Sequence, residues 1–154
     1  MAKRTKKTNN FRKVGKMELL IALGTDDGKN LKGDDHVGMS KYFDVYKFSP
    51  GKEEFVERRR NVKFKEDRSI KHGDPMKARA TASVLKNVDV LVGRRFGPNL
   101  PRLLKRFVCI VVRTDTINNT IRILRNNIDK IIEEKNKGER RKHIVLKTIM
   151  EPKK

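Results

Sequence analysis

The chain has one cysteine, few acidic residues and no long hydrophobic run, and each scarcity excludes a class of protein. Cys109 is the single cysteine among 154 residues. An intrachain disulfide, or a metal cage built from several thiolates of this chain, is therefore excluded. The apolar runs are far shorter than the roughly 20 residues that a membrane span requires, and no apolar segment follows the basic N-terminus. We therefore expect a cytosolic protein without a membrane segment.

The scarcity of acidic residues leaves a large positive charge, which gathers toward the two ends of the chain. Lysine and arginine number 39 against 19 aspartate and glutamate, a net charge of +20. Residues 1–16 hold seven basic residues and no acid, and residues 135–154 hold eight basic and two acidic residues. Since the length suits a single domain, we divide the chain into a basic N-terminal arm (1–16), one domain (17–136) and a basic C-terminal tail (137–154).

The basic ends allow two interpretations. Such segments are typical of arms that attract polyanions, which indicates nucleic-acid binding through the tails. They are equally typical of solvated ends that keep a protein soluble. Phe11 is the one aromatic residue of the N-terminal arm, so stacking on nucleic-acid bases has little support there.

Three short apolar runs predict buried strands, at residues 19–23, 88–92 and 107–112. A partly alternating segment at residues 42–48 and a second at 53–64 enclose the turn sequence Ser-Pro-Gly. This pattern predicts an antiparallel hairpin. In its second strand we expect Phe55 and Val62 to face inward.

Helices are predicted between and after these strands. Asp74 is placed to cap a helix that has Pro75 at its first position, and a short helix follows near residues 99–106. We expect the last helix to be long and capped by Thr114 or Asp115. The first helix should bury Met76, Ala80, Val84 and Leu85, and the last should bury Ile117, Ile121, Leu124, Ile128 and Ile131.

The order of elements is strand, hairpin, helix, strand, helix, strand, helix. It predicts an α/β fold with a three-layer α/β/α architecture, a mixed sheet of five strands and about three helices. Residues 143–149 either add one more strand or stay loose. In such a sheet, ligands bind beyond the carboxyl ends of the parallel strands, so the loops at residues 24–39, 93–98 and 113–115 are the candidate site.

Several residues of these loops suit a metal or an anion. His36 is a candidate metal ligand because imidazole serves a protein without a thiolate cluster, and His72 could face the same crevice. Gly93 and Gly97 bracket a loop whose amides could approach an anion, and Arg94 and Arg95 add charge. The alternative is a strand-to-helix turn that needs glycine.

Four carboxylates, those of Asp26, Asp27, Asp34 and Asp35, permit a divalent-metal nuclease as a third hypothesis, since two-metal sites gather carboxylates. Asp26 and Asp27 also suit a turn that they stabilise by backbone hydrogen bonds. Cys109 lies in an apolar run and is expected to be a buried small hydrophobe rather than a reactive thiol.

Three segments of the chain resemble a known family. They are residues 21–28 (IALGTDDG), residues 35–46 (DHVGMSKYFDVY), and residues 88–93 (VDVLVG) together with the later Phe-Gly-Pro at 96–98. The chain is similar over about residues 17–134 to the dinitrogenase iron-molybdenum cofactor biosynthesis family, the NifX/NafY-like domains. His36 and Gly38 fall on the His-Phe-Gly motif of that family, with Val37 in place of the phenylalanine.

The resemblance implies a ribonuclease-H-like fold and the binding or carriage of an iron–sulfur or iron–molybdenum cluster precursor, without catalytic turnover. His36, Gly38, Gly93, Arg94, Arg95 and Gly97 would form the cluster site, with His36 as a metal ligand and His72 as a second one. The implied partners are proteins that donate and accept the cluster. We expect a monomer or a weak dimer.

Overall fold

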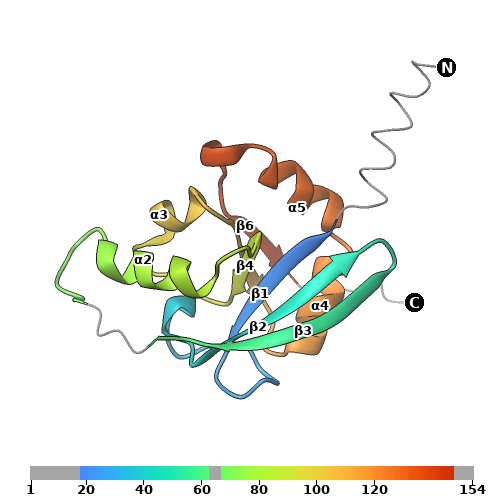
Figure 1. Ribbon diagram of the computed structural model, residues 1–154, viewed down its shortest axis with the longest axis horizontal. Helices are drawn as coiled ribbons and strands as arrows, with labels where there is room; N and C mark the ends of the chain where they lie inside the picture. The colour runs from blue at the N-terminus through green and yellow to red at the C-terminus, as the bar shows by residue number, and fades with distance from the viewer. Residues whose placement is uncertain (1–17, 63–66, 148–154) are drawn as a thin grey trace.

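The structure, a computed structural model, describes residues 18–62 and 67–147, and these form a six-stranded sheet between helices (Figure 1). The strands are β1 (Leu19–Thr25), β2 (Tyr42–Ser49), β3 (Lys52–Arg60), β4 (Val90–Gly93), β5 (Val108–Arg113) and β6 (Ile144–Lys147). The helices are α2 (Pro75–Val84), α3 (Leu100–Leu104), α4 (Ile117–Arg125) and α5 (Ile128–Lys135), with short 3-10 turns η1 (Val37–Met39) and η2 (Gly138–Arg140).

The sheet is mixed, with the strand order β3-β2-β1-β4-β5-β6. β1, β4, β5 and β6 run parallel to one another, and the hairpin of β2 and β3 lies at one edge, with β2 antiparallel to both β1 and β3. The α/β class and the ribonuclease-H-like mixed sheet with a hairpin are confirmed. The expected five strands are one too few, and the expected three helices are also one too few among the described residues.

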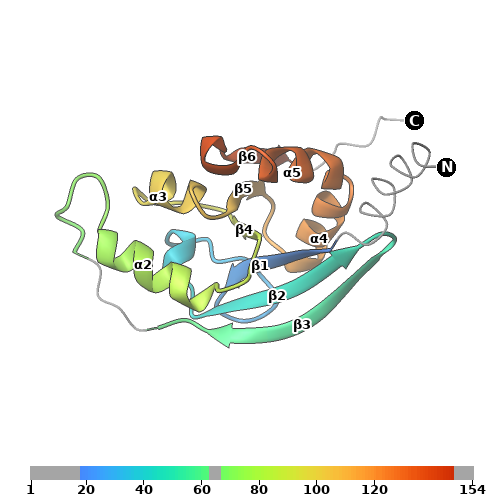
Figure 2. The same ribbon diagram turned by 45° about the horizontal axis from the view of Figure 1, so that its top comes forward.

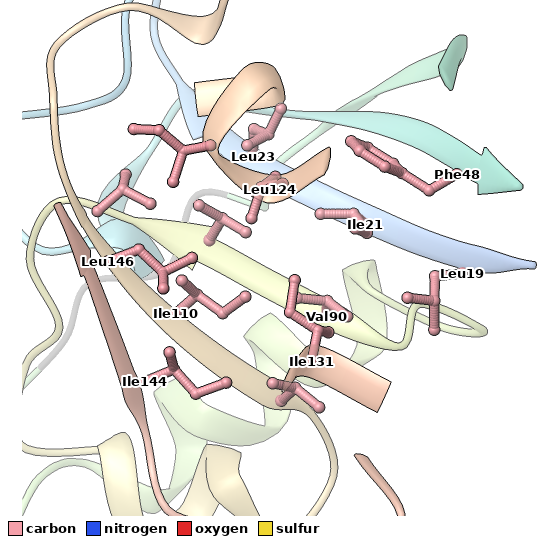
Figure 3. Close-up of a cluster of buried hydrophobic side chains, with 14 of the residues drawn as sticks. Leu19, Ile21, Leu23, Phe48, Val90, Ile110, Leu124, Ile131, Ile144 and Leu146 are labelled. Atoms are coloured by element: carbon pink, nitrogen blue, oxygen red, sulfur yellow. The ribbon is translucent and has the colours of Figure 1, made fainter. Parts of the chain in front are cut away.

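Two hydrophobic clusters, one on each face of the sheet, make the three layers. α4 and α5 cover one face, where Leu124 and Ile131 pack on side chains of β1, β4, β5 and β6 (Figure 3). α2 and α3 cover the other face, where Leu85 and Leu103 pack with Phe43 of β2. Figure 2 shows the two helix pairs on opposite sides of the strands. β1 is buried almost throughout, as expected for a central strand covered on both faces.

The predicted hairpin is present, but its second strand does not face inward as expected. β3 is the edge strand, and Phe55 and Val62 are 53% and 45% exposed. Neither of the two hydrophobic clusters under the helices includes Phe55 or Val62. Phe55 instead packs edge-on against Tyr46 of β2, with the ring centroids 5.5 Å apart.

The last helix of the prediction is two helices. α4 ends at Arg125 and α5 begins at Ile128, with Asn126 and Asn127 between them. The Asn127 side chain donates to the carbonyl of Ile123 at 2.7 Å, and such bonds compete with continued helix. The predicted cap was also wrong: Thr116, not Thr114 or Asp115, accepts the bond from the Asn119 amide.

The predicted inner face of α2 was wrong in part. Asp74 caps the helix as expected, because its carboxylate accepts from the Met76 amide at 3.0 Å. Met76 is 55% exposed, however, and the residues that α2 buries are Lys77, Ala78 and Thr81. The helix therefore turns a partly polar face toward the interior.

Part of the expected C-terminal tail belongs to the sheet. Residues 144–147 form β6, which pairs in parallel with β5 and buries Ile144 and Leu146. The N-terminal arm at residues 1–16 and the last residues, 148–154, lie outside the described residues. No helix within the described ranges is long and apolar enough to span a membrane.

Candidate functional site

The three candidate loops meet at the carboxyl ends of β1, β4 and β5, as the topology rule predicts. The loop after β1 bonds to the loop after β5: the Leu31 amide donates to the Asp115 carbonyl at 2.8 Å, and the Ile117 amide to the Lys29 carbonyl at 2.9 Å. The loop after β1 also bonds to the loop after β4, since the Val37 amide donates to the Arg95 carbonyl at 2.8 Å. The three loops therefore form one continuous surface.

Val37 holds the loop after β1 down on the ends of the strands. Its side chain is 2% exposed and packs on Gly24 of β1 and Gly93 of β4. A Cβ atom added at Gly93 would lie 2.6 Å from the Cβ of Val37, closer than packed carbon atoms allow. Because Gly93 has no side chain, Val37 can pack closely against the end of β4.

The imidazole of His36 packs against Gly97 and lies near Gly38. A Cβ atom at Gly97 would lie 2.8 Å from Cδ2 and 3.0 Å from Nε2 of His36, so the ring rests directly on the backbone of the loop after β4. The other ring nitrogen, Nδ1, would lie 3.8 Å from a Cβ atom added at Gly38. The His36 side chain is 18% exposed, which leaves part of the ring at the surface.

Two residues that the sequence analysis missed, Lys77 and Thr81 of α2, converge on the same place. Cε of Lys77 and Oγ1 of Thr81 would lie 3.8 Å and 3.5 Å from a Cβ atom at Gly38. Both residues are nearly fully buried, with exposures of 3% and 2%. The sequence analysis missed Lys77 and Thr81 because apolar periodicity selects Met76, Ala80 and Val84 rather than the polar positions of α2. Lys77 thus places a buried lysine near His36, in a region where Asp35 lies 3.8 Å from Nε2 of the same ring.

Arg94 and Arg95 lie in the same loop as Gly97 but extend away toward the other loops. Arg94 pairs with Asp115 at 3.3 Å and lies against Gly33. Arg95 reaches the carbonyl of Gly33 at 3.5 Å. Both are part of the surface at the carboxyl edge, and their printed contacts tie the loops together.

The four carboxylates of this region are engaged by basic groups and backbone amides. Asp26 and Asp34 share Lys32, at 2.7 Å and 2.9 Å. Asp35 accepts from the Arg68 guanidinium at 2.9 Å and the His36 amide at 2.8 Å. Asp27 accepts from the amides of Lys29 and Asn30, each at 2.8 Å. These backbone bonds lower the pKa of Asp27 to about 2, as expected for a carboxylate that closes a turn.

His72 and Cys109 lie apart from this arrangement. His72 is exposed, and its carbonyl accepts from Arg102 at 2.7 Å. Cys109 is fully buried in β5 under α2 and α3, and burial raises the pKa of its thiol to about 12. Within residues 18–62 and 67–147, no three His, Cys, Asp or Glu side chains are grouped closely enough to hold a metal ion. The region supplies one imidazole, a buried lysine and backbone amides.

Comparison with known proteins adds a family. A family model described as dinitrogenase iron-molybdenum cofactor matches residues 17–133, about three quarters of the chain. The matched region includes every candidate residue of the site. No curated protein matches the chain.

Proposed function

The chain belongs to the dinitrogenase iron-molybdenum cofactor family, and from this premise we propose that it binds and carries an iron–sulfur or iron–molybdenum-type cluster or a precursor of one. His36 is the protein ligand of this cargo in the proposal. The chain holds the cargo and releases it to a partner protein, without catalytic turnover.

One observation carries the proposal, the placement of His36. Its ring is partly exposed at the carboxyl edge of the sheet and packs on Gly97. This is the position at which α/β sheets bind their ligands. A ring packed on the backbone keeps one orientation, and a fixed orientation strengthens a metal ligand.

The charge around His36 is mixed, because Lys77 lies near the ring and a carboxylate oxygen of Asp35 lies 3.8 Å from its Nε2. Metal–sulfur clusters carry net negative charge through their sulfides and thiolates. Lys77 lies near His36, and its side chain is buried. Low-dielectric surroundings strengthen the attraction between the lysine ammonium and an anion. The Gly97 loop adds backbone amides to the same surface.

The donor set also supports reversible binding. Cys109 is buried and has a raised pKa, so it is no thiolate ligand for a surface cluster. His36 is then the nitrogen ligand at the carboxyl edge in this proposal, and the remaining ligands come with the cargo or from a partner. A carrier with a single protein ligand exchanges its cargo readily.

The test is anaerobic titration of the protein with ferrous iron and sulfide, followed by charge-transfer absorbance. We expect uptake by the native chain and a loss of at least tenfold in affinity in His36→Ala, since one ligand is removed. His143→Ala is the matched control, because it removes an exposed imidazole elsewhere in the chain. His72→Ala tests the second candidate ligand.

Equal uptake by the native protein and His36→Ala would contradict the assignment of His36. No uptake by any of these proteins, repeated with tetrathiomolybdate as the probe, would contradict cluster carriage itself. Circular dichroism of each variant confirms that the fold is intact before the uptake values are compared.

A further inference from the structure

A groove of about 510 Å³ lies at the edge of the sheet opposite to His36, on the face that α2 and α3 cover (Figure 1). Its floor is apolar and consists of Leu85, Val88 and Phe107, which are at most 6% exposed. Val88 precedes β4 and Phe107 precedes β5, so the groove is at the amino ends of these parallel strands. We call it the amino-edge groove.

The rim of the amino-edge groove is basic. Arg79 belongs to α2, Lys86 to the turn after α2, and Arg106 to the turn between α3 and β5. All three side chains are exposed. No aspartate or glutamate is among the residues that line the groove. Positive charge thus borders the groove from two sides.

These three positive charges are not neutralised within the described chain. The ion pairs among the described residues include none of the three, and Arg79 contacts only the sulfur of Met76, at 3.3 Å. Carboxylates on neighbouring segments have other partners. Glu57 pairs with Arg59 at 2.9 Å, and Asp89 accepts from a backbone amide of β1 at 2.9 Å. The groove therefore keeps its charge for a ligand.

The surroundings of the groove do not favour a phosphate ligand. Phosphates in proteins are commonly bound by the free amides of a helix N-terminus, whereas α2 and α3 end at this groove with their C-termini, the negative ends of their dipoles. Nucleic-acid bases stack on exposed aromatic rings, and the one ring that lines the groove, Phe107, is 4% exposed. An organic anion with apolar parts suits the groove better.

The positive charges are spread along the groove rather than gathered at one point. Arg79 and Lys86 are seven residues apart, about 10 Å along a helix, and Arg106 comes from a different segment. An acidic peptide carries several carboxylates along its length, and its apolar side chains suit the floor. We propose that the amino-edge groove docks a short acidic segment of a partner protein, whose carboxylates pair with Arg79, Lys86 and Arg106.

Charge also indicates that this segment belongs to another protein. Residues 1–16 hold seven basic residues and no acid, so the N-terminal arm of the chain is not complementary to the groove. A second copy is disfavoured by the repulsion between two chains of net charge +20. Since the groove is at the amino ends of the strands, a partner docked there leaves His36 at the carboxyl edge uncovered.

The test is fluorescence anisotropy of a labelled peptide that repeats Glu-Glu-Leu over about twelve residues, titrated with the full chain at about 0.05 M salt. We expect a dissociation constant between about 1 μM and about 100 μM. The triple variant Arg79→Glu, Lys86→Glu, Arg106→Glu should bind about tenfold more weakly or worse. A peptide that repeats Gln-Gln-Leu should bind the native chain as weakly as this variant binds the acidic peptide.

A matched control separates the groove from the overall charge. Lys71→Glu, Lys130→Glu and Lys147→Glu together change the net charge by the same amount at exposed positions outside the groove, and this variant should stay within about threefold of native affinity. Positive charge after a helix C-terminus stabilises the helix, so a variant with glutamine at the three groove positions is also measured. Circular dichroism checks the fold of each variant.

Three results would overturn the proposal. The first is no binding of the acidic peptide by the native chain up to about 1 mM. The second is an equal loss of affinity in the groove variant and the matched control, which would assign the binding to overall charge. The third is binding of ATP or an oligouridylate that depends on the groove residues while binding of the peptide does not, which would assign the groove to phosphates.

Discussion

His36 and Gly97 are in contact so close that the glycine has no room for a side chain. A Cβ atom at Gly97 would lie 2.8–3.0 Å from three atoms of the imidazole ring, whereas one at Gly38 would have ordinary contacts of 3.5–3.8 Å. Two glycines near one histidine therefore differ in their tolerance of substitution.

We expect Gly97→Ala to displace the His36 ring and to lower the affinity for the cluster about tenfold or more, the cost usual for a residue that orients a ligand. Gly38→Ala should stay much closer to the native affinity. Both are measured by the same anaerobic titration. If Gly38→Ala lost as much affinity for the cluster as Gly97→Ala, or more, the position of the ring would not control binding.

Asp27 is a residue whose carboxylate stabilises the fold through a turn. Its pKa falls from 3.8 to about 2 because the amides of Asn30 and Lys29 donate to it. A pKa lowered by folding stabilises the protein above the unfolded value of 3.8, and this contribution disappears as the pH falls through about 2.

We therefore expect Asp27→Asn to be less stable than the native chain near neutral pH, and the difference to shrink between pH 3.8 and about 2. Urea unfolding at a series of pH values measures it. Asparagine keeps a side-chain oxygen for the turn, so the substitution isolates the charge. A difference independent of pH would show that the ionised form has no special role.

Among the elements, β6 shows how a short strand in a basic segment becomes part of the core. Its side chains alternate, with Ile144 and Leu146 each 5% exposed and Val145 39% exposed. It lies beside β5, where Val111 and Val112 are its partners. The alternation is the pattern of a strand with one face on the core.

We expect Ile144→Ala and Leu146→Ala each to lower the free energy of unfolding by about 2 kcal/mol or more, since each removes a buried aliphatic side chain. Val145→Ala, on the opposite face of the same strand, should change it by less than about 0.5 kcal/mol. Chemical unfolding followed by circular dichroism measures all three. Equal effects at the three positions would mean that β6 does not pack as described.

The whole molecule carries a net charge of +20, and a charge of this size opposes compaction through self-repulsion. Salt screens this repulsion, with a Debye length of about 10 Å at about 0.1 M. Salt also weakens the ion pairs on the surface, but 39 basic residues cannot all be paired by 19 acidic ones.

We therefore expect the thermal midpoint to rise as sodium chloride increases from about 0.02 M to about 0.2 M. Thermal scans monitored by circular dichroism test it, with sodium sulfate at equal ionic strength as a check on specific anion effects. A midpoint that falls with salt would show that paired charges outweigh the net repulsion.

Much of the architecture was predictable from local patterns. Runs such as residues 19–23 form central strands because both faces of a parallel sheet need apolar side chains. The Ser-Pro-Gly sequence at residues 49–51 predicted the hairpin because these residue types favour a reversal of the chain direction. The meeting of three loops near His36 followed from the topology alone.

The errors share one cause, since periodicity in a sequence does not say what covers each face. Phe55 was expected to point inward, yet it is 53% exposed and belongs to neither of the two clusters that the helices cover. The stripe from Ile117 to Ile131 suits one helix as well as two, and the pair of asparagines decided for two. The burial of Lys77 could not be predicted, because a lysine does not contribute to the apolar periodicity that identifies the buried face of a helix.

The sequence by itself determined the α/β class, the order of the elements and the placement of His36 at the carboxyl edge. These follow from which residues avoid water and which residues turn the chain, and both are local properties. Only the tertiary structure decided that His36 packs on Gly97, that Lys77 of α2 lies near Gly38, and that β3 is the edge strand. These are contacts between segments far apart in the chain, and packing in three dimensions alone selects them.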